Sequence, residues 1–147
     1  MRNTNNHYML RNMNKVILAL LIVCVMAPMA FAKQPDKDYV EVIYFHGKQR
    51  CPTCIAIGKN TRMVIDSDFA KHKKSGKVKF RIIDISTADG KREAKKYRVT
   101  WSSLFVNRVK NGDTTVNNLT QEAFKTARAH SDVFRQELKE AINEALK

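Results

Sequence analysis

The sequence predicts an α/β fold of three layers, in which a central mixed sheet of about four strands is flanked by helices. Segments rich in β-branched and aromatic residues alternate with helical patterns, in the order β-α-β-α-β-β-α. The first strand–helix–strand crossover implies a parallel pair of strands. The sequence Asn111-Gly112-Asp113 predicts a hairpin between the last two strands. We expect these elements to form one domain over residues 39–147.

The first half of this domain contains two strands and the helix between them. Residues 39–46 have the β-branched and aromatic composition of a central strand. A helical pattern follows from Pro52 to about Lys74, because proline suits the first helical position and apolar residues then recur at helical spacing. The residues expected to face the core are Ile57, Val64, Ile65 and Phe69. Residues 78–85 begin with strict alternation and predict the second strand.

The second half contains a helix, a hairpin and two further helices. Residues 88–98 predict a short, very basic helix. Residues 104–109 and 114–119 predict the two strands of the hairpin. Thr120 is expected to cap the next helix, and Ser131 to cap the last one. The last helix is amphipathic, with one apolar stripe made of Phe134, Leu138, Ile142 and Leu146.

The front of the chain has the pattern of a secretory signal peptide. Residues 1–15 carry three basic residues and no acid, residues 16–27 are almost wholly aliphatic, and an Ala-Phe-Ala sequence ends at Ala32. The apolar run is short for a membrane span, which needs ~20 residues, although an uncleaved anchor stays open. We therefore expect a signal peptide over 1–32, a flexible leader over 33–38, and an exported protein that is periplasmic or extracellular.

The net charge and the cysteine content limit which classes of partner we expect for the exported domain. The net charge of +13 falls to +10 once the three basic residues of the predicted signal peptide are removed. Nucleic acid is not an expected partner after export, whereas anionic membrane lipid or acidic proteins are, and a merely soluble surface is an equal alternative. Cys24 lies in the aliphatic run, so that the mature chain keeps Cys51 and Cys54 alone. Disulfides persist outside the cytoplasm. No cofactor is expected, and the domain is expected to be a monomer.

Cys51 and Cys54 lie at the junction between the first predicted strand and the first predicted helix. Two cysteines at this spacing fit a dithiol/disulfide switch. A static disulfide would close only a tiny loop and constrain the unfolded chain little. A structural zinc site needs four ligands, and the chain offers two cysteines and scattered histidines. A two-cysteine site for a thiophilic metal, Cu(I) or trivalent arsenic, stays open as the alternative.

The order of elements, with this pair at the first strand-to-helix junction, resembles the thioredoxin fold over about residues 39–147. Asp84 at the end of the second strand, the approach to the third strand at residues 97–99 and the hairpin at residues 111–112 match the pattern of that fold too. The resemblance implies that Cys51 sits at the start of the helix, partly exposed, and that Cys54 lies one turn inside.

A narrower resemblance concerns the residues around the cysteines. Residues 45–54 and residues 99–103 are similar to an exported group labelled nitrophenyl-compound nitroreductase subunits of an arsenic-resistance type. This resemblance implies an electron-donor subunit of a separate reductase as a further alternative. The partners expected of the oxidoreductase itself are protein thiols and disulfides, with a membrane redox protein as the source or acceptor of electrons.

The thioredoxin-like arrangement implies an activated Cys51. Unpaired backbone N–H groups of the first helical turn, around Thr53 and Cys54, would point at the Cys51 sulfur, and with the helix dipole they favour thiolate over thiol. The positive charge of Arg50 acts in the same direction, and Pro52 starts the helix. We expect Cys51 to attack a partner disulfide and Cys54 to resolve the mixed disulfide.

The sequence departs from the thioredoxin pattern in three places. Arg50 stands where a tryptophan is usual. The buried acid of the first strand has no counterpart in residues 43–45, so that water or a loop group such as His46 would accept the proton of Cys54. For His46 itself, a strand-end histidine bonded to backbone is the favoured interpretation. Ser103 takes the position of the cis-proline, so that no cis bond is expected there.

The loop of Trp101, Ser102 and Ser103 is expected to bind the partner. Loss of the proline ring would uncover the sulfurs on that side and put a hydroxyl near them, which would tune exchange and also ease metal capture. Trp101 is the only tryptophan of the chain. A partner contact and plain packing are equally favoured interpretations of its role.

Overall fold

The computed structural model describes residues 38–147, so that the predicted signal peptide and all of the predicted leader except Asp38 lie outside the described residues. These residues form a four-stranded sheet with the strand order β2-β1-β3-β4. The strands are β1 (Tyr39–His46), β2 (Val78–Asp84), β3 (Ser103–Lys110) and β4 (Asp113–Asn118). β1 pairs parallel with β2 and antiparallel with β3, and β3 pairs antiparallel with β4. The mixed four-stranded sheet predicted from the sequence is confirmed.

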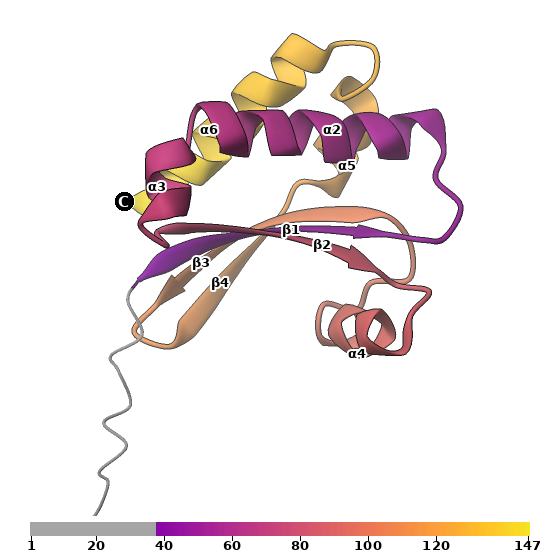
Figure 1. Ribbon diagram of the computed structural model, residues 1–147, viewed down its shortest axis with the longest axis horizontal. Helices are drawn as coiled ribbons and strands as arrows, with labels where there is room; N and C mark the ends of the chain where they lie inside the picture. The colour runs from indigo at the N-terminus through magenta and orange to yellow at the C-terminus, as the bar shows by residue number, and fades with distance from the viewer. Residues whose placement is uncertain (1–37) are drawn as a thin grey trace, which may run out of the picture. The chain divides into compact units, whose positions relative to one another are not determined.

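Helices cover both faces of the sheet and complete the three predicted layers (Figure 1). One face carries α2 (Pro52–Ser67), α3 (Ala70–Lys74), α5 (Thr120–Thr126) and α6 (Ser131–Leu146). The other face carries α4 (Ala88–Lys96). The order of helices and strands is the predicted one, with α3 as an extra short helix, and it confirms the thioredoxin-like fold class. Among residues 38–147, no helix is both long enough and apolar enough to cross a membrane.

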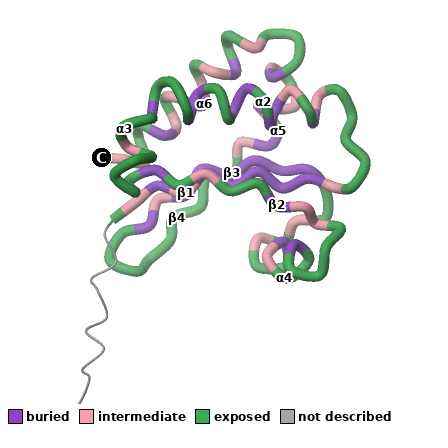
Figure 2. Tube along the Cα trace, in the orientation of Figure 1, coloured by how far each residue is buried: buried purple, intermediate pink, exposed green. Residues whose placement is uncertain are grey.

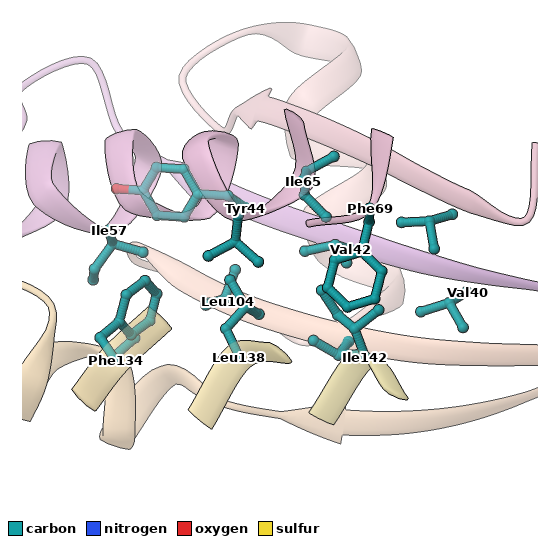
Figure 3. Close-up of a cluster of buried hydrophobic side chains, with 14 of the residues drawn as sticks. Val40, Val42, Tyr44, Ile57, Ile65, Phe69, Leu104, Phe134, Leu138 and Ile142 are labelled. Carbon is teal, nitrogen blue, oxygen red and sulfur yellow. The ribbon is translucent and has the colours of Figure 1, made fainter. Parts of the chain in front are cut away.

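The side chains of β1 alternate between two separate cores. Val42 and Tyr44 point into the larger core beneath α2 and α6, whereas Ile43 and Phe45 point into a smaller core beneath α4. β1 and most of β3 are buried, and β4 is exposed (Figure 2). Figure 3 shows the larger core, in which all four apolar residues predicted for the first helix and the stripe of the last helix meet β1 and β3.

The long first helix predicted for residues 52–74 is wrong, because it is broken into α2 and α3. The backbone N–H groups of Asp68 and Phe69 both donate to the Val64 carbonyl oxygen, at 2.9 and 3.3 Å, and the backbone of Phe69 leaves the helical region. The break turns Phe69 inward, where its side chain is only 3% exposed. No proline or glycine marks this break in the sequence.

The predicted helix caps are also wrong. Thr120 and Ser131 are the first residues inside α5 and α6, and neither is the capping residue. The Thr120 hydroxyl instead accepts a hydrogen bond from the N–H of Leu104, at 3.0 Å, and thereby ties α5 to β3. The Ser131 hydroxyl accepts from the Arg135 guanidinium.

Other element boundaries differ from the prediction by one or two residues, and the hairpin is confirmed. α4 ends at Lys96, before Arg98, whose backbone has a positive φ of 55°. Asn111 and Gly112 both have positive φ, at 54° and 88°, as the two-residue turn of a hairpin requires.

Gly90 lets α4 approach the end of β2 closely. A Cβ atom at this position would lie 1.8 Å from the carbonyl oxygen of Asp84, which is a backbone atom that cannot turn away. The Thr87 hydroxyl caps the helix by accepting from the Gly90 N–H at 3.0 Å, and it donates to the same Asp84 carbonyl. α4 is therefore fixed beside the sheet end that carries the cysteines.

Candidate functional site: the Cys51–Cys54 dithiol

The structure places Cys51 and Cys54 as the thioredoxin-like arrangement implies. Cys51 is the N-cap of α2 and has an extended backbone, and Pro52 is the first helical residue. Both thiols are free; Cys51 is exposed, and Cys54 is only 7% exposed. One sulfur is thus open to a partner, and the other lies behind it at the start of the helix.

Hydrogen bonds at the helix start stabilise the thiolate form of Cys51. The backbone N–H of Cys54 donates to the Cys51 Sγ at a nitrogen–sulfur distance of 3.2 Å. The pKa of Cys51 is lowered, first by a hydrogen bond from the Cys54 thiol and then by the N–H groups of Cys54 and Thr53, while the slight burial of the sulfur opposes them. The N–H groups expected to act on Cys51 are those that the structure brings to it.

The Arg50 side chain is exposed. Hydrogen bonds, rather than Arg50, are the main causes of the shift at Cys51. The pKa of Asp84 is lowered first by hydrogen bonds from Ser86, with smaller contributions from the positive charges of His46 and Arg50. Arg50 therefore contributes positive charge near the site and is not a main cause of the lowered pKa of Cys51.

Tyr44 is the site residue that the sequence analysis missed. Its side chain is fully buried, and its hydroxyl donates to the carbonyl oxygen of Cys54 at 2.6 Å. Gly58, one turn further along α2, makes room for the ring, since a Cβ atom there would lie 3.0 Å from the Tyr44 Cε1. Figure 3 shows the Tyr44 ring among the buried side chains of the larger core. An inward-facing tyrosine in the stretch that lacks the family's acid, with a glycine one turn after the second cysteine, is the signal that would have found it.

Tyr44 is a neutral hydroxyl at physiological pH. Burial and then the negative charge of Cys54 raise the pKa of Tyr44 to about 12, and hydrogen bonding from the Ser102 side chain opposes this. A group with so high a pKa cannot accept a proton from Cys54 near neutral pH. Its contacts indicate instead that it holds the first turn of α2 against the loop at Ser102.

His46 bonds to backbone, as favoured from the sequence. Its Nδ1 lies 2.9 Å from the carbonyl oxygen of Gly47, a contact in which the nitrogen donates. The ring centroid lies 5.9 Å from that of Tyr44. His46 thus borders the site while its Nδ1 is engaged.

The loop before β3 carries a different hydroxyl toward the site than the sequence predicted. The Ser103 hydroxyl donates to the carbonyl oxygen of Trp101 at 3.1 Å, and the hydroxyl that meets the site, through Tyr44, is that of Ser102. Ser102 and Ser103 are buried, and residues 38–147 contain no cis peptide bond. Trp101 is 58% exposed, yet its ring packs 5.1 Å from that of Phe124. Trp101 therefore packs against Phe124 and also keeps exposed surface that a partner could contact.

The two cysteines are the metal-binding candidates that the sequence predicted, and the structure adds no larger cluster among residues 38–147. Within residues 38–147, no three side chains of histidine, cysteine, aspartate or glutamate gather closely enough to hold a metal ion. A metal bound here would rest on the two sulfurs at the start of α2, where the Cys54 N–H lies 3.2 Å from the Cys51 Sγ.

The comparisons with known proteins concern the fold. No protein-family model and no curated protein matches the chain. The chain is similar to the solved structure of a Fasciola hepatica thioredoxin, with 20% identity, a TM-score of 0.46, and coverage of 73% of this chain and 81% of that one. It is also similar to a thioredoxin from Thermus thermophilus, with 18% identity, a TM-score of 0.44, and coverage of 68% and 73%. None of these comparisons supports the narrower resemblance to nitroreductase subunits.

Proposed function

We propose that this chain is an exported thiol–disulfide oxidoreductase in which Cys51 is the nucleophile and Cys54 is the resolving thiol. One observation carries the proposal: an exposed sulfur at the start of α2 receives a backbone N–H bond, has a lowered pKa, and has a second thiol buried behind it. Export is inferred from the signal-peptide pattern of residues 1–32. The setting would be periplasmic or extracellular, where disulfides persist.

The first step of the exchange belongs to Cys51. Its thiolate attacks one sulfur of a partner disulfide, a bond forms between the two sulfurs, and the other partner sulfur leaves as a thiolate. The N–H groups of Cys54 and Thr53 favour the thiolate form of Cys51. The same stabilisation makes Cys51 a good leaving group in the reverse direction, when a partner thiolate attacks the partner sulfur of the mixed disulfide.

The second step belongs to Cys54. Its thiol loses a proton to the departing partner sulfur, the Cys54 sulfur attacks that of Cys51, and the partner is released as a thiol. Two electrons have then passed from the dithiol to the partner disulfide, and the chain holds a Cys51–Cys54 disulfide. Tyr44 holds the backbone of Cys54 throughout, because its hydroxyl bonds to the Cys54 carbonyl oxygen.

The partners of this cycle are inferred from chemistry. Protein thiols and disulfides would meet Cys51 at the loop of Trp101, Ser102 and Ser103, and a membrane redox protein would restore or remove the electrons. Donation of electrons to a separate reductase uses the same dithiol and differs only in the partner.

Capture of a thiophilic metal is the second candidate, because both cysteines lie in the first turn of α2, with the Cys54 N–H 3.2 Å from the Cys51 Sγ. Cu(I) and trivalent arsenic both bind thiolate ligands, and two thiolates are sufficient to coordinate Cu(I). This function predicts a one-to-one complex that is lost on replacement of either cysteine. It differs from the oxidoreductase in needing no exchange with a protein partner.

Replacement of Cys54 by alanine tests the proposal, since the first step would proceed and the second could not. We expect the Cys54→Ala protein, exported in its host, to accumulate disulfide-linked partners that are released by reductant and identified by mass spectrometry. The matched control is the protein with both cysteines replaced by alanine, which should trap none. The opposite result has two parts: the Cys54→Ala protein traps no partner, and the wild-type protein binds Cu(I) or As(III) one to one without disulfide reductase activity. That result would refute disulfide exchange and favour metal capture.

A further inference from the structure

We infer that the surface beside the dithiol, between α4 and α5, is a docking site for an acidic segment of the partner protein that carries an apolar or aromatic residue. The inference rests on the proposed function and adds the kind of polypeptide that Cys51 meets. It follows from two hollows in the surface, from the charges that line them and from an aromatic pair whose tryptophan is exposed.

Two hollows flank the segment of residues 98–101, which leads from α4 into the loop before β3. The first, called here the α4 hollow, has a volume of about 560 Å³ and is lined by Ile85, residues of α4 and residues 98–100. The second, called here the α5 hollow, has a volume of about 630 Å³ and is lined by Trp101, residues of α5 and the end of β4. Arg98 and Val99 line both, so that the two hollows adjoin.

Positive charge dominates the lining of the two hollows. Lys91, Lys95 and Arg98 line the α4 hollow without any acid, and the α5 hollow adds Lys125 and a single acid, Glu122. Among the described residues, none of these four cations forms an ion pair. An acidic segment would find uncompensated charge here, since complementary charge steers association and selects partners.

The acids of α4 do not neutralise this surface, because each is engaged elsewhere. Asp89 forms an ion pair with Arg92, and Glu93 forms ion pairs with Arg81 and Lys96. Lys91 and Lys95 of this helix therefore face the α4 hollow without an ion-pair partner among residues 38–147.

An aromatic pair provides the apolar part of the docking site. Trp101 lines the α5 hollow together with Phe124, its ring centroid lies 5.1 Å from that of Phe124, and 58% of the residue is exposed. Asn118 and Gln121 line the same hollow and offer amide groups to a peptide backbone. Exposed aromatic residues with neighbouring hydrogen-bonding groups are typical of protein-binding surfaces. A concave, amide-lined surface fits an extended polypeptide better than a flat lipid headgroup layer.

The docking site is linked to the backbone of the dithiol through a short chain of contacts. Trp101 precedes Ser102, which meets the Tyr44 hydroxyl, and that hydroxyl bonds to Cys54. At the α4 hollow, the Ile85 N–H donates to the carbonyl oxygen of His46, at the root of the loop that leads to Cys51. A segment bound in the hollows would thus bring its own cysteine to Cys51.

Two synthetic peptides test the inference. Each carries one cysteine, linked as a disulfide to thionitrobenzoate, and one tryptophan, and they differ only in having aspartates or lysines at the remaining positions. Attack by the Cys51 thiolate on the peptide sulfur forms a mixed disulfide and releases the coloured thionitrobenzoate anion. Cys54 then attacks Cys51, its proton passes to the peptide sulfur, and the peptide leaves as a thiol while the dithiol is oxidised. The second-order rate constant of colour release reports docking and attack together.

We expect reduced wild-type protein to react with the acidic peptide at least about tenfold faster than with the basic one at low salt, and the ratio to fall as salt is added. The variant Lys91→Glu/Lys95→Glu/Arg98→Glu should reverse the preference. The matched control is Lys71→Glu/Lys74→Glu/Lys77→Glu, which changes the net charge equally. These lysines lie at or beyond the far end of α2, are exposed and form no ion pair among the described residues, so that the control should keep the preference. Circular dichroism checks that both variants fold.

Each other outcome overturns a distinct claim. Equal rates for the two peptides, or a preference that survives reversal of the three cations of the α4 hollow, would overturn the docking site while leaving the oxidoreductase intact. Binding of the wild-type protein to phosphatidylglycerol-containing vesicles through those three cations, without discrimination between the peptides, would make the surface a membrane contact and refute the inference. No reaction with either peptide would refute the proposed function itself.

Discussion

Replacement of Cys51 by serine is expected to lower the rate of thiol–disulfide exchange by roughly three orders of magnitude or more, as loss of an attacking nucleophile does in other enzymes. A hydroxyl does not ionise near neutral pH and cannot attack a disulfide. Cys54 cannot take over the attack, because it is only 7% exposed and lies behind the first position. The measurement is the reduction of a small disulfide by the reduced variant under excess substrate.

The fold should survive this change. A serine hydroxyl at the start of α2 can still accept the hydrogen bond from the Cys54 N–H that the Cys51 sulfur now accepts, so that the helix keeps its cap. We therefore expect the thermal midpoint of Cys51→Ser to stay close to that of the reduced wild type. The Cys54→Ser protein is the control, since it should complete the first step and stop at the mixed disulfide. A Cys51→Ser protein that still exchanges at a rate comparable to wild type would show that Cys51 is not the nucleophile.

Truncation of Tyr44 should have the largest effect on stability among the residues of the site. Tyr44→Ala removes a fully buried ring from the larger core and is expected to cost about 3–5 kcal/mol, the range for large aromatic residues. Tyr44→Phe keeps the ring and loses only the bond to the Cys54 carbonyl oxygen, for which about 0.5–1.5 kcal/mol is expected. Urea denaturation of the reduced proteins measures both changes.

Tyr97→Phe is the matched control for the role of the Tyr44 hydroxyl. The Tyr97 hydroxyl accepts a hydrogen bond from Asn107 at 3.1 Å, and the ring packs in the smaller core on the other face of the sheet. We expect Tyr97→Phe to cost a similar free energy and to leave the reduction potential of the dithiol unchanged. Tyr44→Phe should shift that potential, because Cys54 loses the group that holds its backbone. Equal potentials in the two variants would reduce Tyr44 to a packing residue.

The parts of the fold that the sequence revealed are those with a local signature. β1 was predicted to the residue, because eight consecutive residues share a strand composition and a glycine follows them. The turn at Asn111-Gly112 was predicted because these residues tolerate positive φ. The break before Phe69 has no such signature, since burial of that side chain in a core formed by distant segments decides it. The same holds for Thr120, whose hydroxyl is drawn to β3 instead of capping its helix.

The features of the site likewise fall into those with a local sequence signature and those that depend on packing between distant segments. The position of Cys51 and the N–H groups around it follow from a local pattern, namely two cysteines with a proline between them after a strand. Tyr44 escaped prediction because its relation to Cys54 depends on how α2 packs on β1. The sequence showed the basic helix and the partner loop at Trp101 separately. It could not show that they line adjoining hollows, because residues from four elements form that surface, nor which cations stay unpaired, because that depends on the ion pairs of the acids.

The lowered pKa of Cys51 has a consequence of definite sign. In the folded, reduced protein the thiolate is favoured, so this group stabilises the fold at pH values above the ordinary thiol pKa. That contribution is lost as the pH falls through the lowered value. The rate of attack should likewise hold to lower pH than that of a free cysteine and then decline as the thiolate is protonated.

The most direct test of the dithiol as a redox site is the pH dependence of alkylation of Cys51 in the reduced protein, followed by mass spectrometry, with free cysteine alkylated in parallel. The helix-start geometry predicts a midpoint for Cys51 clearly below that of free cysteine, and no equivalent low-pH reaction at the buried Cys54. A midpoint at or above that of free cysteine would contradict the account, because Cys51 would then be an ordinary surface thiol.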